Sequence, residues 1–235
     1  MEQFITAFAG TLPQPLFYHS GQEHYGFRYG KPDVRHFCLL KAVRVVSALN
    51  AMIALDRGGY TQEIAVLVRT LIEFTTHIEF VLGGFDDGGV LPPEVEKYVQ
   101  DYFADFRRNN STDFKRAQVR QNTVNERLGT TLDNMAQQIG YAEQRVPSER
   151  TYSDMCLTYS NYVHAKYPEA MDLYGGDPGR FHLDGTLGTS KDEESFASID
   201  TFIDTASIAL QLMVSRLRLH HLVESDAVLS KWFRS

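Results

Sequence analysis

Cysteine, tryptophan and positive charge are all scarce in this chain of 235 residues. The two cysteines, Cys38 and Cys156, lie in stretches with a helical apolar pattern, which favours buried free thiols in a reducing compartment over a disulfide. Acidic residues outnumber basic ones by 30 to 23, for a formal net charge of −7. Because this balance provides no electrostatic footprint for nucleic acid, we expect no duplex DNA partner.

Several recognisable signals are also missing. The N-terminus carries Glu2 and no basic segment ahead of a long apolar run, which is unlike a secretory signal. The apolar stretch 64–82 contains too many ionisable residues for a membrane span. The sequence has no Walker loop, dinucleotide fingerprint or nucleophile elbow, and neither cysteine has a zinc-type partner. We therefore expect a cytoplasmic, soluble protein with no membrane contact, no metal and no cofactor.

What the sequence does contain is helical periodicity. The stretch from Thr61 to Leu82 is apolar on nearly all sides, which is typical of a helix buried in the core of a larger protein. Asp33 is the predicted N-cap of a second long helix that runs to about Asp56. A short link containing Gly58 and Gly59 joins the two, so the sequence predicts an antiparallel helical hairpin.

The remaining chain predicts more helices around this hairpin. Further helical patterns cover about 93–110, 125–139, 149–167 and 194–223. The sequence therefore predicts an all-α fold: an up-and-down bundle of five to seven helices with an irregular N-terminal arm and a Gly-rich loop. The predicted divisions are an arm at 1–32, a bundle at 33–223, a Gly-rich loop at 175–190 within it, and a short C-terminal helix at 224–235.

Three ionisable residues lie along one line of the central helix. Arg69, Glu73 and His77 are spaced i, i+4 and i+8. As a functional site, Arg69 would bind a phosphate or carboxylate, and Glu73 or His77 would move a proton. As a structural feature, they would form an ion pair with His77 at the end of the row. Metal-binding bundles use a Glu-x-x-His unit, and the spacing of four here predicts no metal site.

A second group of polar residues follows in the chain. Ser160 and His164 share one flank of the predicted helix 149–167. His164 would be the base in metal-free RNA cleavage, with Arg69 as the cation near the phosphate, if the helices bring them together. Otherwise it is a helix-end histidine bound to a backbone carbonyl. If the Gly-rich loop is extended, Arg180 and His182 face one side. The candidate catalytic residues are Arg69, Glu73 and His164; the candidate ligand-binding residues are His77, Ser160, Arg180 and His182.

Three segments together carry a family resemblance: VLVRTLIEFTTHIEFVL, YSNYVHAKYPEAMDLYGG and GRFHLDG. They resemble the uncharacterised bacterial helical family known as domain of unknown function 5677, over roughly residues 35–220. That family is similar to the HEPN superfamily of small helical bundles. The resemblance implies a bundle that is often dimeric, and many HEPN proteins are ribonucleases in toxin or phage-defence systems.

The HEPN ribonuclease motif consists of an arginine, four to six intervening residues and then a histidine, with a polar residue directly after the arginine. Only Arg216 and His221 have this spacing here, and Leu217 occupies the polar position. The sequence therefore favours a non-enzymatic module that forms a homodimer or binds a partner protein or a ligand in a polar cleft. The alternative is a HEPN-like, metal-independent ribonuclease, with RNA as the partner.

Overall fold

The computed structural model describes residues 1–20, 24–84, 89–105, 110–125, 128, 159–171, 173–174, 181–189, 199–224 and 230. Its elements are α1 (Glu2–Gly10), β1 (Leu16–Ser20), β2 (His24–Arg28), α2 (Val34–Asp56), α3 (Thr61–Gly83), α4 (Pro93–Tyr102), α5 (Ser111–Asn125), α8 (Tyr167–Met171), α9 (Ile199–Arg216) and α10 (His220–Glu224). The all-α prediction is confirmed, because the β structure in these ranges is limited to one two-stranded sheet and an isolated bridge between Tyr174 and Phe181.

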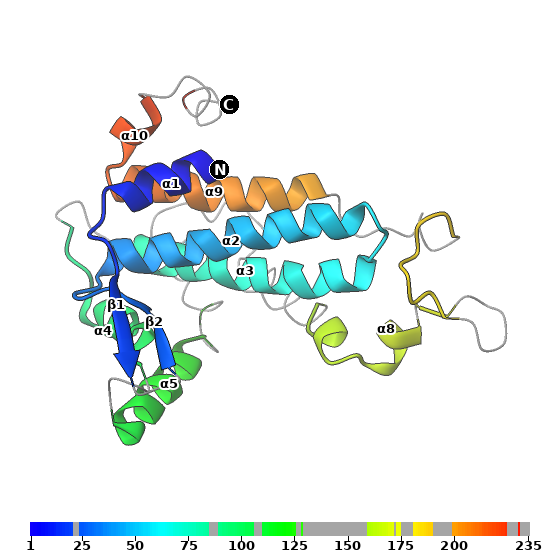
Figure 1. Ribbon diagram of the computed structural model, residues 1–235, viewed down its shortest axis with the longest axis horizontal. Coiled ribbons are helices and arrows are strands. Elements are labelled where there is room, and N and C mark those ends of the chain that lie inside the picture. Colours follow the sequence, from blue (N-terminus) through cyan, green and yellow to red (C-terminus); the bar gives the residue numbers. More distant parts are fainter. Residues whose placement is uncertain are drawn as a thin grey trace, which may run out of the picture.

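The long hairpin of α2 and α3 is the centre of the fold (Figure 1). Asp33 caps α2 as predicted, since its side chain accepts hydrogen bonds from the backbone N–H groups of Arg35 and His36 at 3.0 and 3.2 Å. The helix α3 ends at Gly83, one residue beyond the predicted stretch from Thr61 to Leu82. The antiparallel pairing of the two helices is confirmed as well, with α9 lying along both of them (Figure 1).

The core follows this hairpin in two clusters. Towards the start of α2, the phenylalanine rings of α1, α2 and α3 pack with side chains from α4 and α9. Towards the turn between α2 and α3, aliphatic side chains of the two helices pack with Phe202 and Ala206 of α9. The helices α4 and α5 and the β hairpin gather at the first end, and α8 lies near the other (Figure 1).

The N-terminal segment is more regular than predicted. Residues 1–32 were expected to be an irregular arm, and they instead form α1 and the antiparallel hairpin β1–β2. Phe4 and Phe8 lie one helical turn apart, and both are fully buried, which anchors α1 on the core. Pro13 and Pro15 lie in the connection between α1 and β1, and Pro32 lies between β2 and α2, so no proline interrupts a strand. Phe17 pairs with Phe27 across the strands.

Two predicted helices end earlier than expected. The helix predicted to 110 ends at Tyr102. The last long helix was predicted to reach 223, but α9 ends at Arg216 and α10 begins at His220, because Arg218 adopts a left-handed conformation with φ of 56°. Because of this break and the additional helix α1, the described residues contain eight helices, whereas five to seven were predicted. The predicted helices at 125–139 and 224–235 lie almost wholly outside the described residues.

The described part of the Gly-rich segment is a loop, as predicted, and it docks on the turn between α2 and α3. The backbone N–H and the hydroxyl of the buried Thr186 both donate to the carbonyl of Gly59, at 2.9 and 3.0 Å. Gly185 has a φ of 89°, and a Cβ built on it would lie 2.1 Å from the carbonyl oxygen of Gly58. Glycine is therefore required where these two backbones meet.

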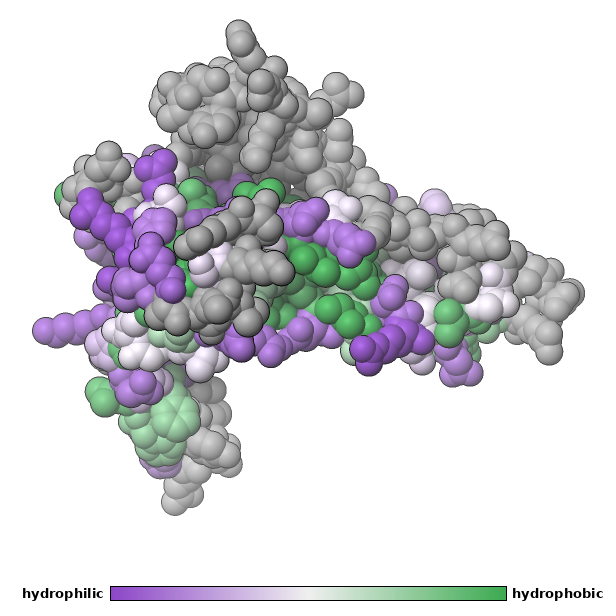
Figure 2. Space-filling model, turned by 90° about the horizontal axis from the view of Figure 1, so that it is seen from above, coloured by the Kyte–Doolittle hydropathy of each residue, from purple (hydrophilic) through white to green (hydrophobic). Residues whose placement is uncertain are grey.

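The helix α2 is long and apolar enough to cross a membrane by length and composition alone. The core helix of a soluble protein passes the same test, and half of the most apolar window of α2 is buried in the protein. Its solvent side includes Val43 and Ile53. Viewed from above, apolar atoms gather in the middle of the molecule with hydrophilic side chains beside them (Figure 2).

Candidate functional site

Arg69 and Glu73 form the ion pair that their spacing predicts. Arg69 Nη1 donates to Glu73 Oε2 at 2.9 Å, and the two side chains are 34% and 29% exposed. Arg69 Nε is buried and has no hydrogen-bond partner. An exposed pair of this kind contributes about 0.3–0.5 kcal/mol to helix stability. The ion pair therefore leaves one donor of the guanidinium unsatisfied.

His77 lies one turn further along α3, in the interior. It is 3% exposed, and neither of its ring nitrogens has a hydrogen-bond partner. The rings of Phe74 and Tyr98 flank it, with centroids 6.3 and 6.0 Å away. Burial, reinforced by the charge of Lys41, lowers the pKa of His77 from 6.5 to about 3. His77 is consequently a neutral imidazole at neutral pH, with both nitrogens unsatisfied.

Lys41 of α2 belongs to the same region and is not among the predicted site residues. It is only 8% exposed, and its Nζ lies 5.5 Å from the ring centre of Phe37, 4.8 Å from that of Phe74 and 4.7 Å from that of Tyr102. Burial lowers the pKa of Lys41 from 10.5 to about 8, against the opposing effect of the Glu73 carboxylate. The sequence signal that could have indicated a buried lysine is its position within the largely apolar run FCLLKAVRVV.

We call this group the polar seam: Lys41, Arg44, Arg69, Glu73 and His77. The guanidinium of Arg44 lies over the ring of Phe74 at 5.8 Å, so it approaches the same ring as Lys41. The carboxylate of Glu73 is paired with Arg69 and acts through space on Lys41, so the seam contains three basic side chains and one acidic side chain. Buried polar atoms without a partner are costly, and the seam contains three of the five that occur within the described residues: Arg69 Nε and both ring nitrogens of His77.

The other predicted site residues lie elsewhere. His164 is exposed, and its backbone N–H donates to the carbonyl of Ser160 at 3.1 Å, while Ser160 itself is half-buried. Within the described part of the chain, no hydrogen bond, ion pair or ring contact joins His164 to Arg69. His182 is half-buried and donates from its backbone N–H to Leu173. Arg180 lies outside the described residues.

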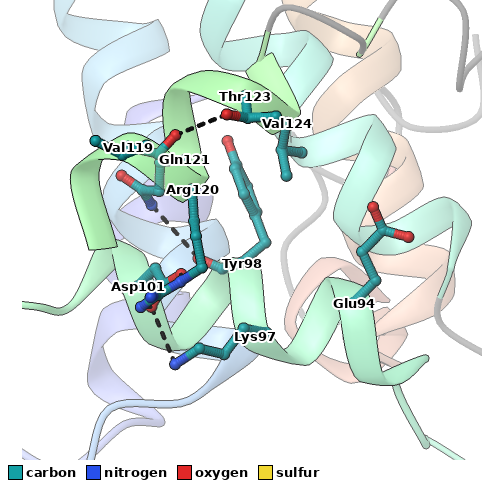
Figure 3. A pocket seen from close by; sticks show the side chains of 9 residues that line it. All are labelled: Glu94, Lys97, Tyr98, Asp101, Val119, Arg120, Gln121, Thr123 and Val124. Carbon is teal, nitrogen blue, oxygen red and sulfur yellow. Dashed lines mark hydrogen bonds and ion pairs between the residues drawn. The ribbon is translucent and has the colours of Figure 1, made fainter. Parts of the chain in front are cut away.

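A separate cavity of about 270 Å³ opens between α4 and α5 (Figure 3). Its lining includes the ring of Tyr98, which contacts His77, and the side chains of Val119 and Val124. The hydroxyl of Tyr98 donates to Asn125 at 2.9 Å. The cavity is therefore adjacent to the polar seam, with the Tyr98 ring between them.

Three charged groups of this cavity are paired with one another. Asp101 accepts from Arg120 at 2.6 and 2.7 Å and contacts Lys97 at 3.1 Å, as the dashed lines in Figure 3 indicate. Burial raises the pKa of Asp101, but hydrogen bonds from Arg120 and Lys97 and their charges outweigh it and leave this pKa below its ordinary value. The side chain of Arg120 thus holds α5 against α4.

The β hairpin presents aromatic rings to solvent. Phe17 and Phe27 are 61% and 64% exposed, and their rings meet edge to face at 5.7 Å. His19 stacks beside Phe17 on the same side, at 6.5 Å. On the opposite side, Arg28 is bound to Asp105. The ion pair fixes one face of the hairpin to the segment that follows α4, and the side chains of Phe17 and Phe27 on the other face are exposed.

No metal site is apparent in the ranges that the structure describes, because no three His, Cys, Asp or Glu side chains gather there. Cys38 is buried, and burial raises the pKa of its thiol well above the ordinary value, so it is an unreactive thiol. Cys156 lies outside the described residues.

Comparisons with protein-family models, with curated proteins and with solved structures find no match to this chain. The resemblance to domain of unknown function 5677 and to HEPN proteins therefore stays a prediction from the sequence. The function has to be argued from the geometry alone.

Proposed function

We propose that the protein is a non-enzymatic helical module that forms a homodimer through the aromatic face of its β hairpin. The observation that carries this proposal is the pair Phe17 and Phe27, both more than three-fifths exposed and already in contact with each other. Aromatic side chains dominate the energetics of interfaces, and such a pair exposed together marks an interaction surface.

The geometry of the sheet supports a second copy as the partner. Two strands alone are marginally stable in water, and both edges of this sheet lack a neighbouring strand in the described residues. In a dimer with two-fold symmetry, Phe17 and Phe27 of one hairpin would meet the same rings of the other. Because each strand of the hairpin has only five residues, the interface area is small, and we expect a dissociation constant of roughly 1–100 μM.

Sedimentation at increasing protein concentration tests this proposal. The wild type is expected to shift from monomer to dimer, and the double variant Phe17→Ser, Phe27→Ser is expected to stay monomeric with an unchanged fold. Leu183→Ser is the matched control, because Leu183 is an exposed apolar side chain on a distant loop. A wild type that remains monomeric at concentrations near 1 mM, or a double variant that dimerises equally well, contradicts the proposed interface.

The ribonuclease alternative has one observation in its favour, the exposed ring of His164. It requires His164 to act with Arg69, and nothing in the described residues links the two. RNA incubated with the protein in EDTA is expected to stay intact. Cleavage by the wild type that is lost in a folded His164→Ala variant would replace the module proposal with an enzyme.

A further inference from the structure

The cavity between α4 and α5 has the size and the lining of a small-molecule site. Its volume of about 270 Å³ is close to the lower end of ligand pockets in proteins, which measure about 300–1,000 Å³. The lining includes Tyr98, which is buried, and Val119, which is 64% exposed. A ligand that enters beside Val119 therefore passes from an exposed apolar side chain towards a buried aromatic one.

Most polar atoms around this cavity are already bonded within the protein (Figure 3). The side-chain amide of Gln121 donates to the carbonyl of Tyr98 at 3.4 Å, and the hydroxyl of Thr123 donates to the carbonyl of Val119 at 3.0 Å. The two basic side chains of the lining are bound to Asp101. Because a ligand gains little by competing with these bonds, the apolar surface has to provide most of its affinity.

The carboxylate of Glu94 is the exception. Glu94 lies in the first turn of α4 and lines the cavity, and no hydrogen bond or ion pair of its side chain occurs in the part of the chain that the structure describes. Tyr98 follows four residues later, so both side chains lie on the same face of the helix. An acidic group thus stands beside the apolar lining with no basic side chain bound to it.

We propose that this cavity binds a small apolar amine, with its apolar group against Tyr98, Val119 and Val124 and its ammonium beside Glu94. A cation suits the unpaired carboxylate, and the formal net charge of −7 attracts cations rather than anions to the protein. At roughly 30 Å³ for each non-hydrogen atom, the volume of about 270 Å³ suits an arylalkylamine with roughly nine such atoms. None of the lining residues belongs to the β hairpin, so the inference is independent of the proposed dimer.

Titration with three probes of similar size tests this inference on the wild-type protein. 2-Phenylethylamine, 2-phenylethanol and 3-phenylpropionate share a phenyl ring and a short chain, and they differ in the charge of the head group. The methyl resonances of Val119 and Val124 report binding by NMR. We expect the amine to shift them saturably, with a dissociation constant of roughly 0.1–1 mM. The alcohol should bind about two- to five-fold more weakly, because an exposed ion pair contributes modestly, and the acid should bind most weakly.

Two pairs of variants separate the parts of the inference. Glu94→Gln should remove the preference for the amine over the alcohol, whereas Glu96→Gln, which changes an acidic residue of the same helix outside the lining, should keep it. Val119→Trp fills the cavity from an exposed position and should weaken the binding of all three probes several-fold. Leu183→Trp, at another exposed apolar position, should leave their binding unchanged.

The inference is overturned if the amine, at ten times its expected dissociation constant, produces no saturable shift of the Val119 and Val124 methyl groups. It is overturned as well if the acid binds more tightly than the amine. A Glu94→Gln variant that stays folded and still prefers the amine to the alcohol by the same factor would also contradict it, because the carboxylate would then have no part in recognition.

Discussion

Acidification from pH 6.5 to pH 3 is expected to remove on the order of 4 kcal/mol of stability through His77 alone. The unfolded histidine takes up a proton near pH 6.5, whereas the folded one does so only near pH 3. Between these values the unfolded state binds the extra proton, so stability falls as the pH falls. The cause is burial: a charged imidazole between Phe74 and Tyr98 would have no hydrogen-bond partner.

Urea unfolding at a series of pH values measures this loss. The matched variant is His77→Phe, which keeps a ring between the same neighbours and cannot be protonated. It should be more stable than the wild type at pH 7 by about 1–2 kcal/mol, because two unsatisfied nitrogens are removed. The difference in unfolding free energy between the wild type and His77→Phe at each pH isolates the contribution of His77 from that of carboxylates such as Asp101. Parallel stability curves for the two proteins below pH 6.5 would rule out a buried neutral His77.

Gly185→Ala is expected to lower the free energy of unfolding by about 2–3 kcal/mol or to detach the loop 181–189 from the turn between α2 and α3. The residue has a φ of 89°, and its new Cβ would lie 2.1 Å from the carbonyl oxygen of Gly58. Because that atom belongs to the backbone, it cannot move aside as a flexible side chain would. Undocking would also break both hydrogen bonds from Thr186 to Gly59.

Thermal melting and hydrogen exchange of the Thr186 amide measure this effect. Gly188→Ala is the control, because Gly188 has a φ of 73° but open space around it. The Gly188→Ala variant should lose only about 1 kcal/mol of stability, from backbone strain, and its Thr186 amide should stay protected from exchange. If the two variants lose the same stability, the close approach of the two backbones is not what positions the loop.

The features that depend on local signals could be predicted from the sequence. Asp33 as the cap of α2, the hairpin of α2 and α3, and the ion pair of Arg69 with Glu73 all follow from spacing within one helix or one turn. Helical periodicity and glycine stop signals involve residues that are close together in the sequence, so the sequence alone predicts the helices and turns that they form.

The features that were missed depend on contacts between distant segments. The rings around Lys41 come from three helices: Phe37 of α2, Phe74 of α3 and Tyr102 of α4. Helical periodicity places each ring on a face of its own helix and does not indicate which faces meet. The β hairpin was missed because the prolines and glycines of residues 1–32 indicated irregular structure, although Pro13 and Pro15 lie before the strands.

Hydrogen exchange of the hairpin amides at two protein concentrations tests the proposed dimer most directly. At concentrations well above the dissociation constant, peptides covering β1 and β2 should exchange several-fold more slowly than at dilution. The double variant Phe17→Ser, Phe27→Ser should not show this dependence. If the hairpin exchanges at the same rate at both concentrations while the wild type sediments as a dimer, the copies meet through another surface and the proposed interface is wrong.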